Sequence, residues 1–225
     1  PAGAETVIRQ RIAERGPITF AEFMSVALYG RDGYYASRMA LGPQGDFTTA
    51  PLTHPVFGAL VARQIEQMWR ELGAPPAMTV VEAGAGSGQL AADVVAASDS
   101  LDGAFARALR YVALDYASAP ARQRVHWLRS GGLPVAGLRG VILGNELIDA
   151  MPVHRMTMAD GVLREIRVSV DNAGKFEETL AEPEEGLAQR LTFLGVRLSD
   201  GHRAEICLDS TRWVAEAAGA VISRR

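Results

Sequence analysis

The sequence predicts an α/β protein with a parallel sheet, a helical amino-terminal region and an antiparallel β insertion. Three patterns support this fold class: helical spacing of apolar residues before residue 75, short apolar runs alternating with helical segments after it, and period-two alternation beyond residue 153. We therefore divide the chain into a helical region over 1–75 and a sheet domain over 76–225, with the insertion at about 153–180.

The amino-terminal region carries clear helix signals. Thr19 and Glu22 have the spacing of a Ser/Thr-x-x-Glu capping box, and Gly30 is placed to end the helix that follows. The strongest helical pattern begins at Pro55, where apolar residues recur three or four positions apart as far as Leu72. Between these helices, a segment rich in glycine, proline and aromatic residues predicts an ordered loop.

The parallel sheet is predicted from four runs whose near-continuous hydrophobicity suits strands covered on both faces. These runs are Thr79–Ala83, Arg110–Asp115, Val125–Leu128 and Gly140–Asn145. Beyond them, Asp160-Gly161 and the segment 171–174 are typical hairpin turns, which predicts the antiparallel insertion. A last amphipathic helix is expected from about Thr211 to Val221.

The composition excludes several classes of protein. Apolar residues make up 48% and charged residues 22% of the 225 residues, which is typical of a globular protein. The net charge of −3 gives no electrostatic footprint for nucleic acid, and the single cysteine excludes an internal disulfide framework. No run of about eighteen apolar residues predicts a membrane span, and the histidines lack metal-ligand spacing. We expect no nucleic acid partner, no membrane span and no metal.

The most informative segment is a glycine-rich turn, Glu82-Ala83-Gly84-Ala85-Gly86-Ser87-Gly88, which follows the first predicted strand. Glycines permit a tight turn and close approach of a ligand, and the amides of the following helix add the positive end of a dipole. A dinucleotide fingerprint would place its third glycine at position 89, where glutamine stands. The turn therefore predicts a Rossmann-type nucleotide site and disfavours NAD.

Two further runs give this sequence a resemblance to a known family. The glycine turn resembles the first motif of class I methyltransferases. The run Asn145-Glu146-Leu147-Ile148-Asp149-Ala150-Met151-Pro152-Val153 resembles the MidA-like family within that class, as do Gly45–Pro51 and Phe57-Gly58. The resemblance implies a Rossmann-like class I methyltransferase sheet and methyl transfer from S-adenosylmethionine.

The family also implies an acceptor and a location. In its mitochondrial member the acceptor is an arginine of a respiratory complex I subunit, so the resemblance implies a protein substrate, arginine methylation and complex I assembly. It places the chain in the mitochondrial matrix if eukaryotic and in the cytoplasm if bacterial. The sequence indicates no oligomeric state.

The resemblance implies roles for particular residues on the cofactor side. The methionine part of the cofactor would lie along Gly84, Ala85, Gly86 and Gly88, with Glu82 beneath them. Asp115, at the end of the next strand, would accept both ribose hydroxyls. The loop residues Asp46 and Thr48 would add polar contacts if that loop closes over the cofactor, and the alternative is a purely structural turn.

Asn145, Glu146 and Asp149 are the candidate catalytic or substrate-contacting residues, because carboxylates would offset the charge of a guanidinium acceptor. The alternative is that Glu146 caps a short helix and Asp149 fixes the turn before Pro152.

Other functions remain open at this point. One is an NAD-dependent oxidoreductase, and another is a catalytically silent assembly factor or binding module that keeps the fold. Class I methyltransferase sheets normally have seven strands, but only one further candidate, Ala204–Leu208, follows the insertion. We therefore expect that this chain lacks the carboxyl-terminal part of the sheet.

Overall fold

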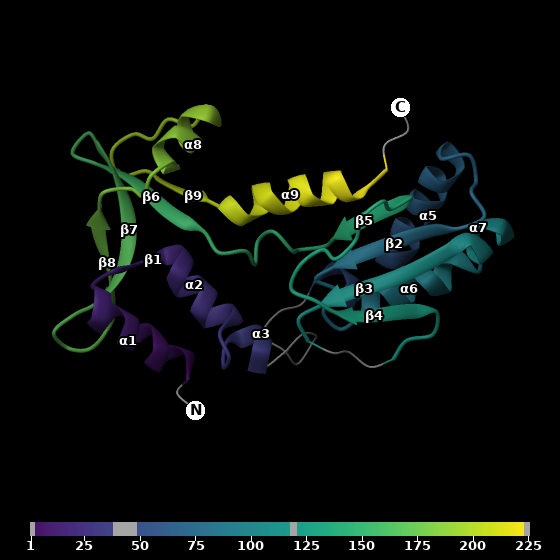
Figure 1. Cartoon of the computed structure of the whole chain (residues 1–225), viewed down its shortest axis with the longest axis horizontal. Helices are drawn as coiled ribbons and strands as arrows, with labels where there is room; N and C mark the ends of the chain where they lie inside the picture. Colours follow the sequence, from purple (N-terminus) through teal and green to yellow (C-terminus); the bar gives the residue numbers. More distant parts are fainter. Residues whose placement is uncertain (1–2, 38–48, 118–120, 223–225) are drawn as a thin grey trace. The chain divides into compact units, whose positions relative to one another are not determined.

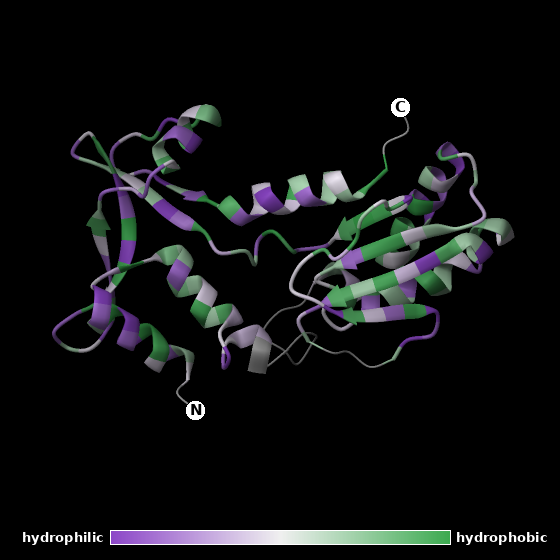
Figure 2. Cartoon of the chain, viewed as in Figure 1, coloured by the Kyte–Doolittle hydropathy of each residue, from purple (hydrophilic) through white to green (hydrophobic). Residues whose placement is uncertain are grey.

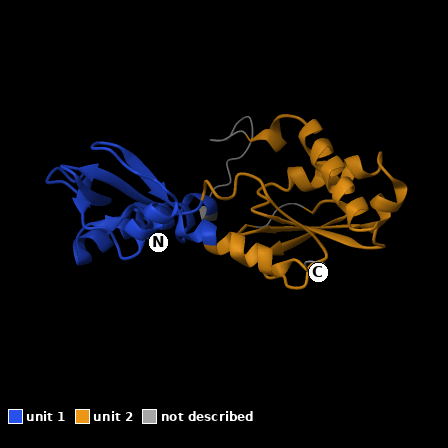
Figure 3. Ribbon diagram, turned by 90° about the horizontal axis from the view of Figure 1, so that it is seen from above, with its two compact units in different colours: residues 1–37, 151–211 blue, residues 38–150, 212–225 orange. Residues whose placement is uncertain are grey.

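The chain divides into two compact units in its computed structural model, which describes residues 3–37, 49–117 and 121–222. Unit 1 comprises Pro1–Ser37 and Met151–Thr211, and unit 2 comprises Arg38–Ala150 and Arg212–Arg225 (Figure 3). These units do not follow the division expected at residue 75, because the first two helices pack against a strand of the predicted insertion.

Unit 2 contains the predicted parallel sheet. Its strands are β2 (Met78–Ala83), β3 (Leu109–Asp115), β4 (Val125–Arg129) and β5 (Gly140–Gly144). They lie in the order β4-β3-β2-β5, and every pairing is parallel (Figure 1). The four predicted strands are confirmed, except that β5 ends one residue earlier than expected and Asn145 lies beyond it.

Figure 2 shows that the strands of this sheet are largely apolar. Helices cover one face, and the other face is partly buried, because Val81 and Leu114 are buried but Leu128 is 48% exposed. The helices of unit 2 are α4 (Ala50–Thr53), α5 (Val56–Glu71), α6 (Gln89–Ser98) and α7 (Gly103–Ala108). A buried cluster joins α5, α6 and α7 to Met78, Val80 and Tyr111. A second cluster contains Val81, Leu114 and Leu138. The predicted helix beginning at Pro55 is therefore confirmed as α5.

The two principal helices of unit 2 approach each other closely at Gly58 of α5. A Cβ atom at this position would lie 2.4 Å from Cβ of Asp93 on α6 and 3.1 Å from the backbone carbon of Asp93. Only glycine allows this helix spacing.

Unit 1 contains the predicted antiparallel sheet, with five strands (Figure 1). They are β1 (Ile18–Thr19), β6 (His154–Ala159), β7 (Val162–Val170), β8 (Phe176–Ala181) and β9 (Arg203–Ile206). β9 pairs with β6, and β6 and β1 pair with successive parts of one edge of β7, at residues 162–166 and 167–168. β8 pairs with the opposite edge of β7, at residues 165–170. Asp160 and Gly161, with φ values of 52° and 71°, make the predicted tight turn between β6 and β7.

The last predicted strand belongs to this antiparallel sheet rather than to the parallel one. Residues 203–206 pair with β6, and the helix α9 (Leu208–Ala220) begins directly afterwards. The described residues therefore supply four strands to the parallel sheet, compared with the seven typical of class I methyltransferases.

The helices of unit 1 are α1 (Ala4–Arg15), α2 (Phe20–Tyr29), α3 (Tyr34–Ser37) and α8 (Leu187–Phe193). The predicted cap of α2 is confirmed, because Oγ1 of Thr19 accepts a hydrogen bond of 3.1 Å from the Glu22 amide. Ile8, Ile12 and Val26 bury the apolar faces of α1 and α2 against Val168 of β7. None of the helices in the described part of the chain is long and apolar enough to cross a membrane.

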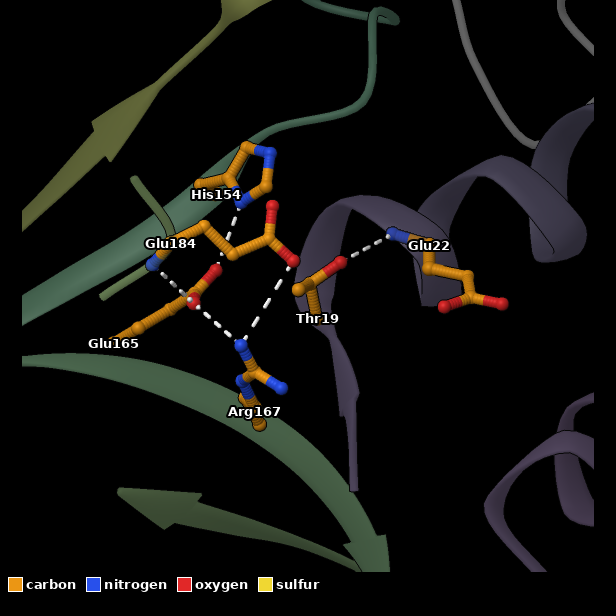
Figure 4. Close-up of polar contacts among 6 residues, drawn as sticks. All are labelled: Thr19, Glu22, His154, Glu165, Arg167 and Glu184. Carbon is orange, nitrogen blue, oxygen red and sulfur yellow. Dashed lines mark hydrogen bonds and ion pairs between the residues drawn. The ribbon is translucent and has the colours of Figure 1, made fainter. Parts of the chain in front are cut away.

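A buried ionic cluster ties the strands of unit 1 together (Figure 4). Glu165 of β7 is fully buried; Nδ1 of His154 lies 2.8 Å from its Oε1, and its Oε2 accepts from Nη2 of Arg167 at 3.2 Å and the Glu184 amide at 3.3 Å. Burial acts to raise the pKa of Glu165, but the hydrogen bonds from His154 and Arg167 outweigh it and lower the pKa. The cluster therefore holds a charged carboxylate inside the unit.

Candidate functional site

The candidate site lies at the carboxyl ends of three parallel strands in unit 2. Ala83 of β2 pairs with Leu114 of β3 on one side and with Gly144 of β5 on the other. The residues that follow these strands therefore meet at one edge of the sheet. β2 comes first in the chain but lies between β3 and β5 in the sheet, so the strand order reverses beside β2. Open α/β sheets bind ligands at this kind of switch point.

The backbone conformation of the glycine turn at this edge requires glycine at three positions. Gly84, Gly86 and Gly88 have φ values of 70°, 55° and 71°, a region that other residues rarely adopt. The Ala85 amide donates a hydrogen bond of 3.0 Å to the carbonyl of Leu114, which fastens the turn to β3. Gly88 is the N-cap of α6, so the turn leads directly into the amides of a helix start.

Asp115 is brought directly against this turn. Its Oδ2 accepts a hydrogen bond of 2.9 Å from the Gly86 amide, and its Oδ1 accepts one of 3.0 Å from the Ala117 amide. Each carboxylate oxygen has a second lone pair that can accept from a further donor. The arrangement therefore joins a glycine-rich turn to a carboxylate that can accept hydrogen bonds from hydroxyl groups.

Glu82 lies just before the turn and is only 2% exposed. The hydroxyl of Tyr111 donates a hydrogen bond of 3.0 Å to its Oε2. Burial raises the pKa of Glu82 to about 7; the Tyr111 hydrogen bond acts in the opposite direction, and the charge of Asp115 adds to the increase. This carboxyl group therefore changes its charge near neutral pH.

The segment after β5 packs over the same turn. Cδ1 of Leu147 lies 2.8 Å from the position that a Cβ atom at Gly84 would occupy. Glu146 has a φ of 49°, and strained backbone of this kind at a non-glycine residue is concentrated at functional sites. In the described part of the chain, the exposed side chains of Glu146 and Asp149 make no hydrogen bond or ion pair.

Residues 145–149 form no helix, so the alternative in which Glu146 caps one is wrong. Asn145 is half-buried at the end of β5. Asp46 and Thr48, the predicted contacts from the loop, lie outside the described residues.

Two residues near the turn were not predicted from the sequence. The ring of Trp127 on β4 lies 3.2 Å from the position of a Cβ atom at Gly88, and its Nε1 donates to the Ala117 carbonyl at 3.1 Å. Nη2 of Arg122 lies 3.5 Å from the Ser87 carbonyl oxygen. The apolar pattern of β4 predicted the strand, but only its register with β3 places Trp127 beside the turn.

The site offers oxygen acceptors and backbone amides rather than a set of metal ligands. Within residues 3–37, 49–117 and 121–222, no group of three or more His, Cys, Asp or Glu side chains is arranged to hold a metal ion.

Curated proteins with similar sequences share one name. The chain is 29% identical over 201 residues to the mitochondrial "Protein arginine methyltransferase NDUFAF7 homolog" of Drosophila melanogaster, covering 76% of the chain and 46% of that protein. It is 28% identical over 193 residues to the human mitochondrial "Protein arginine methyltransferase NDUFAF7", covering 72% of the chain and 44% of that protein. The chain thus spans about half the length of the curated relatives that it matches.

Solved structures and a family model both match this chain. A crystal structure of a Burkholderia thailandensis protein bound to S-adenosyl-homocysteine aligns with a TM-score of 0.82 and 27% identity, over 97% of this chain and 59% of that one. A native crystal structure of a protein from the same organism aligns with a TM-score of 0.77 and 29% identity, over 97% and 58%. Residues 60–222 match a family model described as "Putative S-adenosyl-L-methionine-dependent methyltransferase". The chain belongs to this methyltransferase family, which confirms the resemblance to MidA-like proteins and the class I methyltransferase fold.

Proposed function

We propose that this chain binds S-adenosylmethionine at the carboxyl edge of the parallel sheet and takes part in methyl transfer to a protein. One observation carries the proposal: the hydrogen bond between the Gly86 amide and Asp115, which joins the glycine turn to an acidic strand end at the switch point. The family match and the S-adenosyl-homocysteine in the similar Burkholderia thailandensis protein support it.

The residues of this edge fit the chemical groups of the cofactor. Asp115 would accept the ribose hydroxyls with the lone pairs that its two amide contacts leave over. Gly84, Gly86 and Gly88 give the turn the positive φ values that would let its backbone and the start of α6 approach the methionine part. The charge of Glu82, directly before the turn, would favour the cationic amino group at this end of the ligand.

The chemistry requires alignment above all. S-adenosylmethionine supplies an electrophilic methyl group on a sulfonium, and methyl transfer is an in-line displacement that needs no covalent enzyme intermediate. The chain has to hold the acceptor nitrogen in line with that methyl group and exclude water. Asn145, Glu146 and Asp149 follow β5 at the same edge, and we propose that they bind the acceptor.

The acceptor that we propose is an arginine side chain. A guanidinium remains protonated at neutral pH, so it needs carboxylates to offset its charge and to accept the proton that methylation displaces. The Glu146 and Asp149 carboxylates, which make no hydrogen bond or ion pair with the described residues, provide such groups. The relatives named as mitochondrial protein arginine methyltransferases support this acceptor and, for a eukaryotic chain, a mitochondrial location. A complex I subunit as substrate, and a cytoplasmic location for a bacterial chain, rest on the family resemblance alone.

Calorimetric titration tests the binding proposal. We expect S-adenosylmethionine and S-adenosyl-homocysteine to bind and NAD not to bind. Asp115→Asn should weaken S-adenosyl-homocysteine about tenfold or more, because hydrogen bonds to a charged acceptor contribute about 1.5–3 kcal/mol. Asp99→Asn is the matched control, because Asp99 is exposed and bonds Arg124 rather than the turn. Binding of NAD without either adenosyl ligand would show the proposal to be wrong.

Transfer of a labelled methyl group from S-adenosylmethionine to proteins of a cell lysate tests the activity. Hydrolysis of the labelled product should release methylated arginine. Release of another methylated amino acid would contradict arginine as the acceptor. Ligand binding without transfer to any protein would instead identify a catalytically silent binding module.

A further inference from the structure

A buried pair of polar side chains joins β2 to β3 underneath the glycine turn. Glu82 pairs with Ala113 across the ladder, so Tyr111, two residues before Ala113, extends from the same face of the sheet. That face is the one covered by α5, α6 and α7. Tyr111 has no exposed surface, Glu82 is 2% exposed, and the hydroxyl and Oε2 are 3.0 Å apart.

Among the described residues, Tyr111 donates the one side-chain hydrogen bond to the Glu82 carboxylate. On β3, the other titratable group that acts on Glu82 is Asp115, whose negative charge disfavours ionisation. β5 contains no titratable residue. On α6, the acidic residue is Asp93, which accepts a hydrogen bond of 2.8 Å from Gln89. Burial and Asp115 therefore both oppose the charge on Glu82, and the Tyr111 hydroxyl favours it.

Tyr111 remains a hydrogen-bond donor throughout the physiological pH range. Burial and the neighbouring Glu82 charge raise the pKa of Tyr111 above its ordinary value of 10.0. Its hydroxyl therefore keeps its proton, and Glu82 is the member of the pair that titrates.

We propose that Tyr111 is a positioning residue for the amino-acid end of the ligand: its hydroxyl orients Glu82 and keeps it charged, so that ligand binding is linked to loss of a proton from Glu82. The inference rests on the proposed function, because the linkage needs a ligand with an ammonium group at this turn. When Glu82 is protonated in the free protein, binding of that ammonium group releases the proton to solvent and leaves a carboxylate opposite the cation.

The linkage predicts how affinity depends on pH. With the pKa of Glu82 at about 7 in the free protein, the affinity for S-adenosyl-homocysteine should fall about tenfold between pH 8 and pH 6. Tyr111→Phe removes the hydroxyl with little change of shape. Loss of this hydrogen bond should raise the pKa of Glu82 by about one unit and enlarge the fall in affinity to about fiftyfold.

Isothermal titration calorimetry of the wild-type chain and of Tyr111→Phe from pH 6 to pH 8 tests the inference. Both proteins experience the same ionisation of the ligand, so the difference between their profiles reports on Glu82. Methylthioadenosine, which lacks the amino-acid chain, should show the same pH profile with both proteins. A Tyr111 that only packs the core would weaken both ligands equally at every pH.

A second variant protects the test against a folding defect. In Glu82→Gln the affinity for S-adenosyl-homocysteine should lose the part of its pH dependence that comes from Glu82. Adding Tyr111→Phe to this variant should then leave the pH profile of the affinity unchanged. Circular dichroism checks that each variant is folded. Superimposable profiles of Tyr111→Phe and wild type would overturn the inference while leaving the proposed function intact. Failure of the wild-type chain to bind S-adenosyl-homocysteine at any pH would overturn both.

Discussion

The buried carboxylate of unit 1 allows a prediction of stability with a defined pH dependence. Glu165→Gln keeps the shape of the side chain but removes the charge that His154, Arg167 and the Glu184 amide stabilise. Hydrogen bonds to a charged group contribute about 1.5–3 kcal/mol, and glutamine keeps part of this network. We expect a loss of about 2–3 kcal/mol at pH 7, below the roughly 3–5 kcal/mol typical of breaking a fully buried ion pair, because the Arg167 side chain is 27% exposed.

Hydrogen exchange of the amides in β6 and β7 measures this loss locally. All three tryptophans belong to unit 2, so their fluorescence does not report on unit 1. At pH 7 the amides should exchange about 30- to 150-fold faster in Glu165→Gln than in wild type, as 2–3 kcal/mol requires. The ratio of the two rates cancels the intrinsic effect of pH on exchange.

The pH dependence follows from the direction of the pKa shift. Because the pKa of Glu165 is lowered in the folded protein, its stabilisation is complete above the unfolded value of about 4.5 and is lost as pH falls through the folded value. The exchange ratio should therefore be constant above pH 4.5 and decrease towards one as pH falls below it. The control, Glu205→Gln, alters a carboxylate that is 64% exposed and 3.8 Å from Arg155, and should change stability by less than about 0.5 kcal/mol. A ratio that does not decrease as pH falls below 4.5, or that is no larger than in the control at pH 7, would refute the reasoning.

Three further substitutions test unit 2. Gly84→Ala should lower the free energy of unfolding by about 1–2 kcal/mol, because residue 84 has a φ of 70° and the added Cβ would meet Leu147. Calorimetry should show an affinity for S-adenosyl-homocysteine about tenfold lower, and unchanged affinity would contradict this role of the turn. Gly58→Ala should lower the free energy of unfolding, measured in urea, by about 1–2 kcal/mol. The clash of a Cβ placed 2.4 Å from Cβ of Asp93 outweighs the roughly 1 kcal/mol of helix propensity that alanine adds. A stabilised variant would show that the two helices can separate to admit the methyl group. Glu146→Gln should reduce methyl transfer at least about 100-fold while leaving ligand affinity within about twofold, and unimpaired transfer would exclude its proposed role.

The sequence predicted the elements whose signals are local. The central strands of unit 2 are largely apolar because one face is buried under helices and the other is partly buried, and the glycines of the turn stand where the backbone needs positive φ. The capping box of Thr19 and Glu22 depends on residues three positions apart. Each of these features is specified within a few residues, so a pattern along the chain is sufficient to find it.

Features set by distant pairing could not be predicted in this way. β5 ends at Gly144 rather than Asn145 because its partner β2 leaves the ladder after Ala83 and enters the turn. The strand predicted at Ala204–Leu208 was counted toward the parallel sheet, but residues 203–206 pair with β6 of the insertion. The hydrogen bond from Tyr111 to Glu82 also depends on the register of two strands, which no local pattern specifies.

The central position of β7 has a consequence for the folding of the chain during synthesis. β7 pairs with β6 and β1 along one edge and with β8 along the other, and β1 reaches it through Ile18 and Val168. The helices α1 and α2 therefore leave the ribosome before unit 2 but bury their apolar faces only after the parallel strands of unit 2 have been made. Such long-range closure is slow, and we expect the amino-terminal helices of the nascent chain to be a binding site for chaperones until β7 emerges.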